Sequence, residues 1–113
     1  MAGIIEDYYA SWGGTDPDAV VAFMTDDVEF EDVTMKEAHQ GKDRVRRFVA
    51  ACFKVVPGVK YEIVASRVSD ETYWVEWVMQ PQGLRGASVG LLRDGKIAMN
   101  HDYWNGAEFK PGG

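Results

Sequence analysis

The strongest candidate for a catalytic residue is Asp32, an acidic side chain on a strand face that is otherwise apolar. From Val28 to Asp32 apolar and acidic residues alternate, and in an extended strand alternate side chains point to the same face. Val28, Phe30 and Asp32 therefore share the face expected to be buried. Burial raises the pKa of a carboxyl group toward neutrality and makes it a better proton acceptor. We interpret Asp32 as a candidate general base; alternatively, it ends the strand and caps the following loop near Thr34.

A second carboxyl group, Asp102, lies near the end of the chain on another alternating segment. It shares a strand face with Asn100 and Trp104, whereas His101 shares the opposite face with Tyr103. Only one of these sets can point into the interior, and the alternation does not decide which. An inward Asp102 would polarise a substrate or relay a proton, and His101 would then face solvent or a second subunit.

Three further polar side chains are candidates for the site. Tyr8 lies on the first amphipathic segment, where its hydroxyl could donate a hydrogen bond to an oxyanion; alternatively, it is a core tyrosine with a satisfied hydroxyl. His39 precedes Gly41 in a loop and either reaches a pocket mouth or is solvated. Glu76 alternates with more apolar neighbours that are expected to be inside, so we place it outside the site.

The sequence predicts chemistry without a metal or cofactor. Its two histidines and single cysteine lie far apart, without metal-ligand spacing. A nucleophile triad, a phosphate loop and a dinucleotide glycine pattern are also missing. Cys52 lies in an apolar stretch, where a thiol behaves as a small hydrophobic side chain. Acid/base catalysis by side chains is the remaining class.

Composition and charge limit the partners. The 113 residues fit one domain, residues 1–113, and the net charge of −6 argues against nucleic acid and anionic membranes. The first residues lack the basic and apolar regions of a signal peptide, and no apolar run is long enough to span a membrane, so a cytoplasmic setting is expected.

Hydrophobic periodicity predicts the elements that would position these residues. Helices are expected over residues 4–12, from residue 16 through 24, and over 42–56, with strands at 28–32, 59–68, 72–80, 87–92 and 97–104 and a loop at 33–41. Short links make consecutive strands antiparallel, and the helices must cover one face of a curved sheet. The predicted fold is α+β, a cone around one apolar pocket. The side chains expected to line this pocket are Trp12, Phe23, Phe30, Phe48, Phe53, Asn100 and Trp104.

Three local patterns accompany this order of elements. They are Tyr8-Tyr9 followed by Asp16, Ala19, Asp26-Asp27 and Glu31-Asp32; Gly41-Lys42-Asp43; and Asp94-Gly95-Lys96-Ile97 leading to Asp102-Tyr103-Trp104. The order of the predicted helices and strands, together with these three patterns, resembles the nuclear-transport-factor-two-like superfamily over nearly the whole chain. This superfamily includes ketosteroid isomerases, SnoaL-like polyketide cyclases and limonene epoxide hydrolase. The resemblance implies a pocket for a small apolar molecule and a homodimer formed through the outer face of the sheet.

The resemblance also implies roles for the candidate residues. In the isomerases, the residue matching Asp32 is the base and the one matching Tyr8 donates a hydrogen bond to the oxyanion; the second acid of that family would fall at residues 85–87, where this chain has none. In the epoxide hydrolases, a motif similar to residues 101–105 carries the water-activating aspartate at the position of Asp102. SnoaL-like cyclases use aspartate for acid/base work.

Three hypotheses follow. The leading one is a cofactor-independent enzyme that moves a proton on a small, largely apolar carbonyl compound, as an isomerase or a polyketide cyclase does, with Asp32 as base. The second is a non-catalytic binding or dimerisation module whose cleft is filled by its own side chains. The third is an epoxide hydrolase in which Asp102 and Asp32 hold the water.

Overall fold

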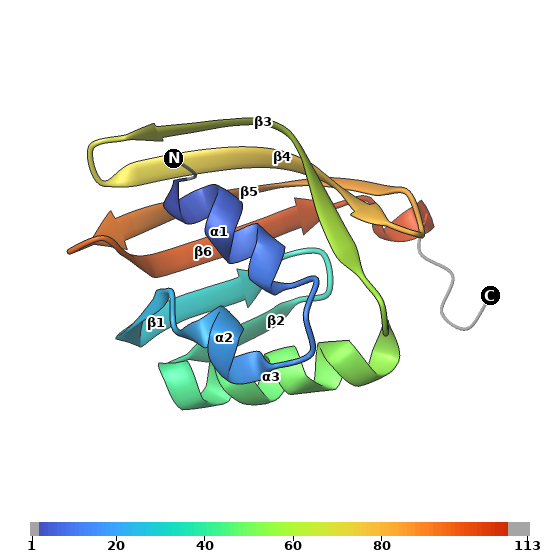
Figure 1. Cartoon of the computed structure of the whole chain (residues 1–113), viewed down its shortest axis with the longest axis horizontal. Helices are drawn as coiled ribbons and strands as arrows, with labels where there is room; N and C mark the ends of the chain where they lie inside the picture. The colour runs from blue at the N-terminus through green and yellow to red at the C-terminus, as the bar shows by residue number, and fades with distance from the viewer. Residues whose placement is uncertain (1–2, 109–113) are drawn as a thin grey trace.

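The computed structural model describes residues 3–108 and arranges them as helices packed on one side of a curved sheet (Figure 1). The helices are α1 (Ile4–Ser11), α2 (Pro17–Val21) and α3 (Lys42–Val55), and a short 3-10 helix, η1 (Gly106–Glu108), follows the last strand. The strands are β1 (Met24–Asp32), β2 (Glu37–Gln40), β3 (Lys60–Ser69), β4 (Thr72–Gln80), β5 (Leu84–Arg93) and β6 (Lys96–Trp104). The predicted α+β class is confirmed.

The six strands form one sheet in the order β2-β1-β6-β5-β4-β3. Strands β3 to β6 follow one another through short turns and pair antiparallel, as expected. The sheet is nevertheless mixed, because β1 pairs with β6 in parallel. The argument from short links does not apply to this pair, since β1 and β6 are separated in the chain by α3 and by four strands. This parallel contact brings residues from opposite ends of the chain together.

Two predicted boundaries are corrected by the structure. The second helix ends at Val21, and Met24 already belongs to β1, where it is fully buried and pairs with Ile97. Pairing in the sheet here outweighs the helical spacing of the apolar residues. The expected loop at 33–41 contains β2, an exposed edge strand that pairs with β1. Because β2 is short and mostly exposed, it carries no hydrophobic alternation to predict it.

The apolar core lies between the helices and the concave face of the sheet. Helix α1 packs against β3, and α3 packs against β1 and β2. The buried cluster combines Ile5, Tyr8 and Tyr9 of α1 with inward side chains of the sheet such as Val28 and Val75. No helix among residues 3–108 combines the length and the apolar character that crossing a membrane requires.

Candidate functional site

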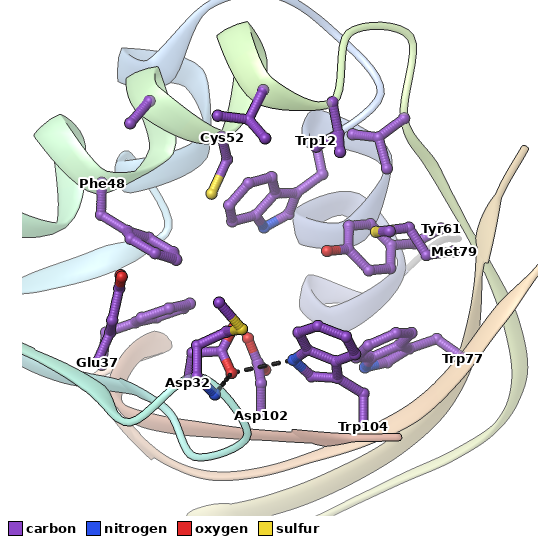
Figure 2. Close-up of a pocket in the computed structure, with 16 residues that line it drawn as sticks. Trp12, Asp32, Glu37, Phe48, Cys52, Tyr61, Trp77, Met79, Asp102 and Trp104 are labelled. Carbon is purple, nitrogen blue, oxygen red and sulfur yellow. Dashed lines mark hydrogen bonds between the residues drawn. The ribbon is translucent and has the colours of Figure 1, made fainter. Parts of the chain in front are cut away.

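A cavity of about 270 Å³ lies between α3, the end of α1 and the sheet (Figure 2). This volume is near the lower end of the range for small-molecule sites. Aromatic rings form much of its wall, among them Trp12, Phe48, Tyr61, Trp77 and Trp104. The side chains that line it also include three carboxylic acids and no lysine, arginine or histidine among the described residues.

Asp32 and Asp102 are neighbours on the floor of this pocket. The parallel pairing of β1 with β6 sets them opposite each other in register, and both line the cavity (Figure 2). Burial raises the pKa of Asp32, and it raises the pKa of Asp102 to about 6. The charge of Asp32 adds to the rise at Asp102. The open question about strand β6 is thereby answered: Asp102 faces the pocket.

Asp32 both lines the cavity and caps the turn that follows its strand. Its Oδ1 accepts a hydrogen bond from the backbone N–H of Met35 at 3.0 Å, which caps the turn after β1. The same oxygen accepts a bond from the indole N–H of Trp104, also at 3.0 Å (Figure 2). These bonds favour the charged form and offset part of the cost of burial. The carboxyl group is therefore fixed in place while it lines the cavity.

Asp102 is held from the side of the core. Ser88 donates its hydroxyl to Oδ1 of Asp102 at 2.5 Å, and the side-chain amide of Asn100 donates to the same oxygen at 2.8 Å. Both bonds lower the pKa of Asp102 against the larger effect of burial. Since both go to Oδ1, neither uses the second oxygen, Oδ2. Ser88 and Asn100 are fully buried and fix the orientation of the carboxyl group.

A further layer of side chains fixes the direction of these hydrogen bonds. The indole N–H of Trp77 and the hydroxyl of Tyr9 donate to Ser88 Oγ at 2.9 and 2.7 Å. Because Ser88 thus receives two bonds, its own proton is directed to Asp102. On the other side, Tyr73 donates to Oδ1 of Asn100 at 2.5 Å, which turns the amide N–H₂ group toward Asp102. The hydroxyl of Ser88 and the amide of Asn100 are therefore both oriented toward Oδ1 of Asp102.

The structure places Tyr8 in the core and another tyrosine in the pocket. Tyr8 is 1% exposed, packs edge-on against Tyr9, and is not among the residues that line the cavity. Tyr61 of β3 lines the cavity, and Figure 2 shows its hydroxyl pointing into it. Burial, reinforced by the charge of Asp102, holds the pKa of Tyr61 well above its usual value, so the hydroxyl keeps its proton. Tyr61 can donate a hydrogen bond where Tyr8 does not reach.

Four of the seven expected lining residues lie in the wall: Trp12, Phe30, Phe48 and Trp104. The other three do not, and each has another role. Phe23 follows α2 and packs against Tyr8 with ring centroids 6.1 Å apart. Phe53 lies behind Trp12, edge-on to it at 5.8 Å. Asn100 is fully buried beneath Asp102 instead of being open to the cavity.

The two histidines lie outside the pocket wall. His101 is on the outer face of β6, where its Nε2 is 2.9 Å from Glu29 and 3.8 Å from Glu31. His39 belongs to β2, stacks on Phe48 with a centroid distance of 4.8 Å, and lies 3.6 Å from Glu37. No group of three or more possible ligands among residues 3–108 is arranged to hold a metal ion.

Sequence reasoning missed Ser88, Tyr61 and Glu37. Glu37 lies on the unpredicted strand β2 and is the third acid of the wall. Ser88 had a signal in the spacing of small residues, since Gly86, Ser88 and Gly90 share one face of β5. Their partners on β4 include Trp77 and Tyr73, which fill the space that the glycines leave. A polar residue between two glycines, opposite two aromatic residues, indicates a buried hydrogen-bond acceptor.

Comparison with known proteins gives a family and a fold. The SnoaL-like domain matches residues 5–100. A protein with a ketosteroid isomerase-like fold from Catenulispora acidiphila, solved in complex with trimethylamine, superposes with a TM-score of 0.83 at 17% identity, covering 93% of this chain and 87% of that one. No curated protein matches the chain at the sequence level.

Two further solved structures resemble the chain over most of its length. A proposed polyketide cyclase from Sinorhizobium meliloti has a TM-score of 0.78 at 20% identity, over 91% of this chain and 95% of that one. A proposed isomerase of the SnoaL-like family from Agrobacterium tumefaciens has a TM-score of 0.75 at 16% identity, with the same coverage. The family model is SnoaL-like, and the predicted likeness to limonene epoxide hydrolase gains no support from it. The chain belongs to the SnoaL-like family and has the ketosteroid isomerase-like fold.

Proposed function

We propose that the protein is a cofactor-independent acid/base enzyme that moves a proton on a small, largely apolar carbonyl compound. The observation that carries the proposal is the pairing of Asp32 and Asp102 in register on the floor of an aromatic pocket. Burial raises the pKa of both groups, and neighbouring carboxyl groups with shifted pKa values are suited to acid/base chemistry. Structures of the same fold include a proposed isomerase and a proposed polyketide cyclase, and the reactions that these names describe are of this class.

Asp32 acts as the base in this proposal. Its carboxylate takes the proton from the carbon next to the substrate carbonyl, and the electron pair of that C–H bond moves toward the carbonyl oxygen to form an enolate. If the substrate has a conjugated or adjacent C=C bond, the proton returns from Asp32 to the far carbon of the dienolate, as in isomerisation. In cyclisation the enolate carbon attacks a second carbonyl, whose oxygen takes up the proton from Asp32. The hydrogen bonds from Met35 and Trp104 keep the carboxylate in one orientation throughout.

Tyr61 and Asp102 stabilise the negative charge on the enolate oxygen. Tyr61 presents a protonated hydroxyl to the cavity, and a donor fixed in an apolar site stabilises a developing oxyanion more than water does. Asp102, with a pKa of about 6, holds a proton more readily than an ordinary aspartate and can donate through it. This assignment moves the donor role predicted for Tyr8 to Tyr61.

The test is proton exchange in deuterated water on a panel of small cyclic ketones, followed by NMR. The folded protein should catalyse exchange at the carbon next to the carbonyl, and Asp32→Asn should reduce the rate by a factor of about 10² to 10⁴. Glu31→Gln is the matched control, because Glu31 is adjacent in sequence but faces away from the pocket. A folded Asp32→Asn protein with the full rate would disprove the assignment of the base.

A non-catalytic ligand-binding module is the second candidate, and the aromatic wall favours it. The cavity of about 270 Å³ does not favour the form of this hypothesis in which the protein's own side chains fill the cleft. Ligand binding without any proton exchange across the panel would identify the protein as a binding module.

The expected homodimer belongs to the proposal as well. Large apolar side chains of the outer sheet face, among them Trp74, Val89 and Tyr103, are 41–46% exposed, and Trp74 and Val89 are neighbours in register. We expect this face to bind the same face of a second copy. Light scattering after size exclusion should give twice the chain mass, and Trp74→Glu should give a monomer. The control is Val68→Glu, an exposed apolar residue whose strand partner Tyr73 faces inward; a monomeric parent protein would contradict the expectation.

A further inference from the structure

The charge balance of the pocket singles out one class of ligand. Three of the side chains that line the cavity are acids, Asp32, Asp102 and Glu37, and the described residues that line it include no basic side chain. Glu37 has a partial partner in His39, 3.6 Å away outside the wall. Within residues 3–108 the hydrogen bonds to Asp32 and Asp102 come from neutral donors: a serine, an amide, an indole and backbone N–H groups. His101, on the outer face of β6, lowers the pKa of Asp102 less than these bonds do and does not line the cavity.

Two carboxylates without a counter-ion in an apolar cavity are costly to ionise. The cost is visible in the raised pKa values of both groups. A cation that enters the pocket would offset the cost of ionising these groups, because it would lie next to two negative charges that the register of β1 and β6 places side by side. A neutral or anionic ligand of the same shape would leave the repulsion between them in place.

The rest of the wall suits the apolar part of such a cation. Trp12, Tyr61, Trp77 and Trp104 surround the space above the two acids (Figure 2). The faces of aromatic rings attract organic cations, and rings gathered around a cavity are the usual means of recognising alkylated ammonium groups. A small metal ion could not use these rings, whereas an alkylammonium uses both the rings and the acids.

We propose that the ligand of this pocket carries a positive charge: it is a small organic ammonium ion with apolar substituents, seated above Asp32 and Asp102 and enclosed by the aromatic wall. The inference rests on the proposed site and narrows its substrate to a carbonyl compound that bears such a group. With the cation bound Asp102 is ionised, and Tyr61 is then the donor to the enolate oxygen. Binding can be measured without turnover, so it can fail or succeed independently of the proposed reaction.

The test compares three probes of nearly the same shape: choline, the neutral 3,3-dimethylbutan-1-ol, and the anionic 3,3-dimethylbutanoate. Calorimetry at pH 8 should show choline binding at least about tenfold more tightly than the alcohol, with the anion weakest. Between pH 8 and pH 5 the affinity for choline should fall, because Asp102 takes up a proton near pH 6 and the cation favours its ionised form. The other titratable groups facing the cavity are Asp32, Glu37, Cys52 and Tyr61, and the last two have raised pKa values that keep them neutral over this range.

Variants separate the pocket charges from the net charge of the protein. Asp102→Asn should weaken choline binding and leave the alcohol unaffected, whereas Glu31→Gln removes one negative charge from the outer face and should change neither. If the alcohol or the anion binds as tightly as choline, or if no probe binds at millimolar concentration, the proposal is wrong. Choline binding together with no proton exchange on ketones that carry an alkylammonium group would support this inference and contradict the proposed reaction.

Discussion

The hydroxyl of Ser88 lies 2.5 Å from Oδ1 of Asp102 and is fixed in that direction by the donors Tyr9 and Trp77. Ser88 is fully buried and does not line the cavity, so it acts on a ligand only through Asp102. It is a positioning residue, and its effect can be measured on the titration of its partner.

Ser88→Ala should raise the pKa of Asp102 above about 6, because the lost hydrogen bond favoured the charged carboxylate. The buried donors of Tyr9 and Trp77 also lose their acceptor, which should reduce the free energy of unfolding by about 1–3 kcal/mol. Carbon NMR of labelled aspartate and urea denaturation measure the two effects. Ser66→Ala, on an exposed position of β3, is the control. An unchanged or lowered pKa of Asp102 would show that Ser88 does not orient the carboxyl group.

Asp102 should make stability depend on pH in a way that an asparagine removes. Its pKa is raised in the folded state from 3.8 to about 6, so its contribution is fully present below pH 4 and is lost as the pH rises through 6. The measured quantity is the unfolding free energy of Asp102→Asn minus that of the parent protein. This difference should be about 2 kcal/mol larger at pH 8 than at pH 4, because only the parent loses stability as Asp102 ionises.

The exposed carboxyl groups whose pKa is lowered by an arginine, Asp18 and Asp27, act in the opposite direction. Their contributions to the unfolding free energy are the same in the parent and in Asp102→Asn, so they cancel when the two free energies are subtracted. Thermal or urea denaturation at several pH values gives the comparison, with Glu31→Gln as a charge-matched control. A difference that does not change with pH would mean that Asp102 is not desolvated in the folded protein.

Most of the fold was accessible from the sequence because its signals are local. The first and third helices and the four long strands follow hydrophobic periodicity, and the inward placement of Val28, Phe30 and Asp32 follows strand alternation. The parallel pairing of β1 and β6 was not accessible, since it depends on how segments some seventy residues apart meet in the sheet. For the same reason the sequence proposed Asp32 and Asp102 separately, and only the structure sets them in register.

The tyrosines show the other limit of sequence reasoning. Tyr8 and Tyr61 are both aromatic residues with a polar tip on half-apolar segments, and nothing local distinguishes a hydroxyl in the core from one in a cavity. The difference arises from packing: Tyr61 is held by edge-on contacts with Tyr9, Trp12 and Trp77 at centroid distances of 5.3, 5.9 and 4.9 Å. These contacts join three separate elements, so no pattern within one segment records them.

Tyr61→Phe and Tyr8→Phe should therefore have different effects on proton exchange. Loss of the Tyr61 hydroxyl should reduce the exchange rate constant by about 10²-fold or more with little change in ligand affinity, because the donor acts on charge that develops in the transition state. Tyr8→Phe should leave the rate near that of the parent, since Tyr8 does not line the cavity. Exchange rates from NMR, with folding checked by circular dichroism, decide between them. The reverse order of effects would return the donor role to Tyr8.

Cys52 provides a chemical probe of the charge in the same cavity. Burial raises the pKa of its thiol to about 12, and the charges of Asp32, Glu37 and Asp102 add to this effect. Since the thiolate is the reactive form, alkylation by iodoacetamide at pH 8 should be about a thousandfold slower in the folded protein than in guanidinium. The chain has one cysteine, so a single adduct in the mass spectrum reports the rate.

Asp32→Asn should accelerate this alkylation, because it removes a negative charge that disfavours the thiolate. Glu31→Gln, with the same loss of charge on the outer face, should leave the rate unchanged. A ligand bound in the cavity should protect Cys52, which lines the wall opposite the two acids (Figure 2). If the folded protein reacts as quickly as the denatured one, the thiol is hydrated and the cavity is not the desolvated site on which the acid/base proposal depends.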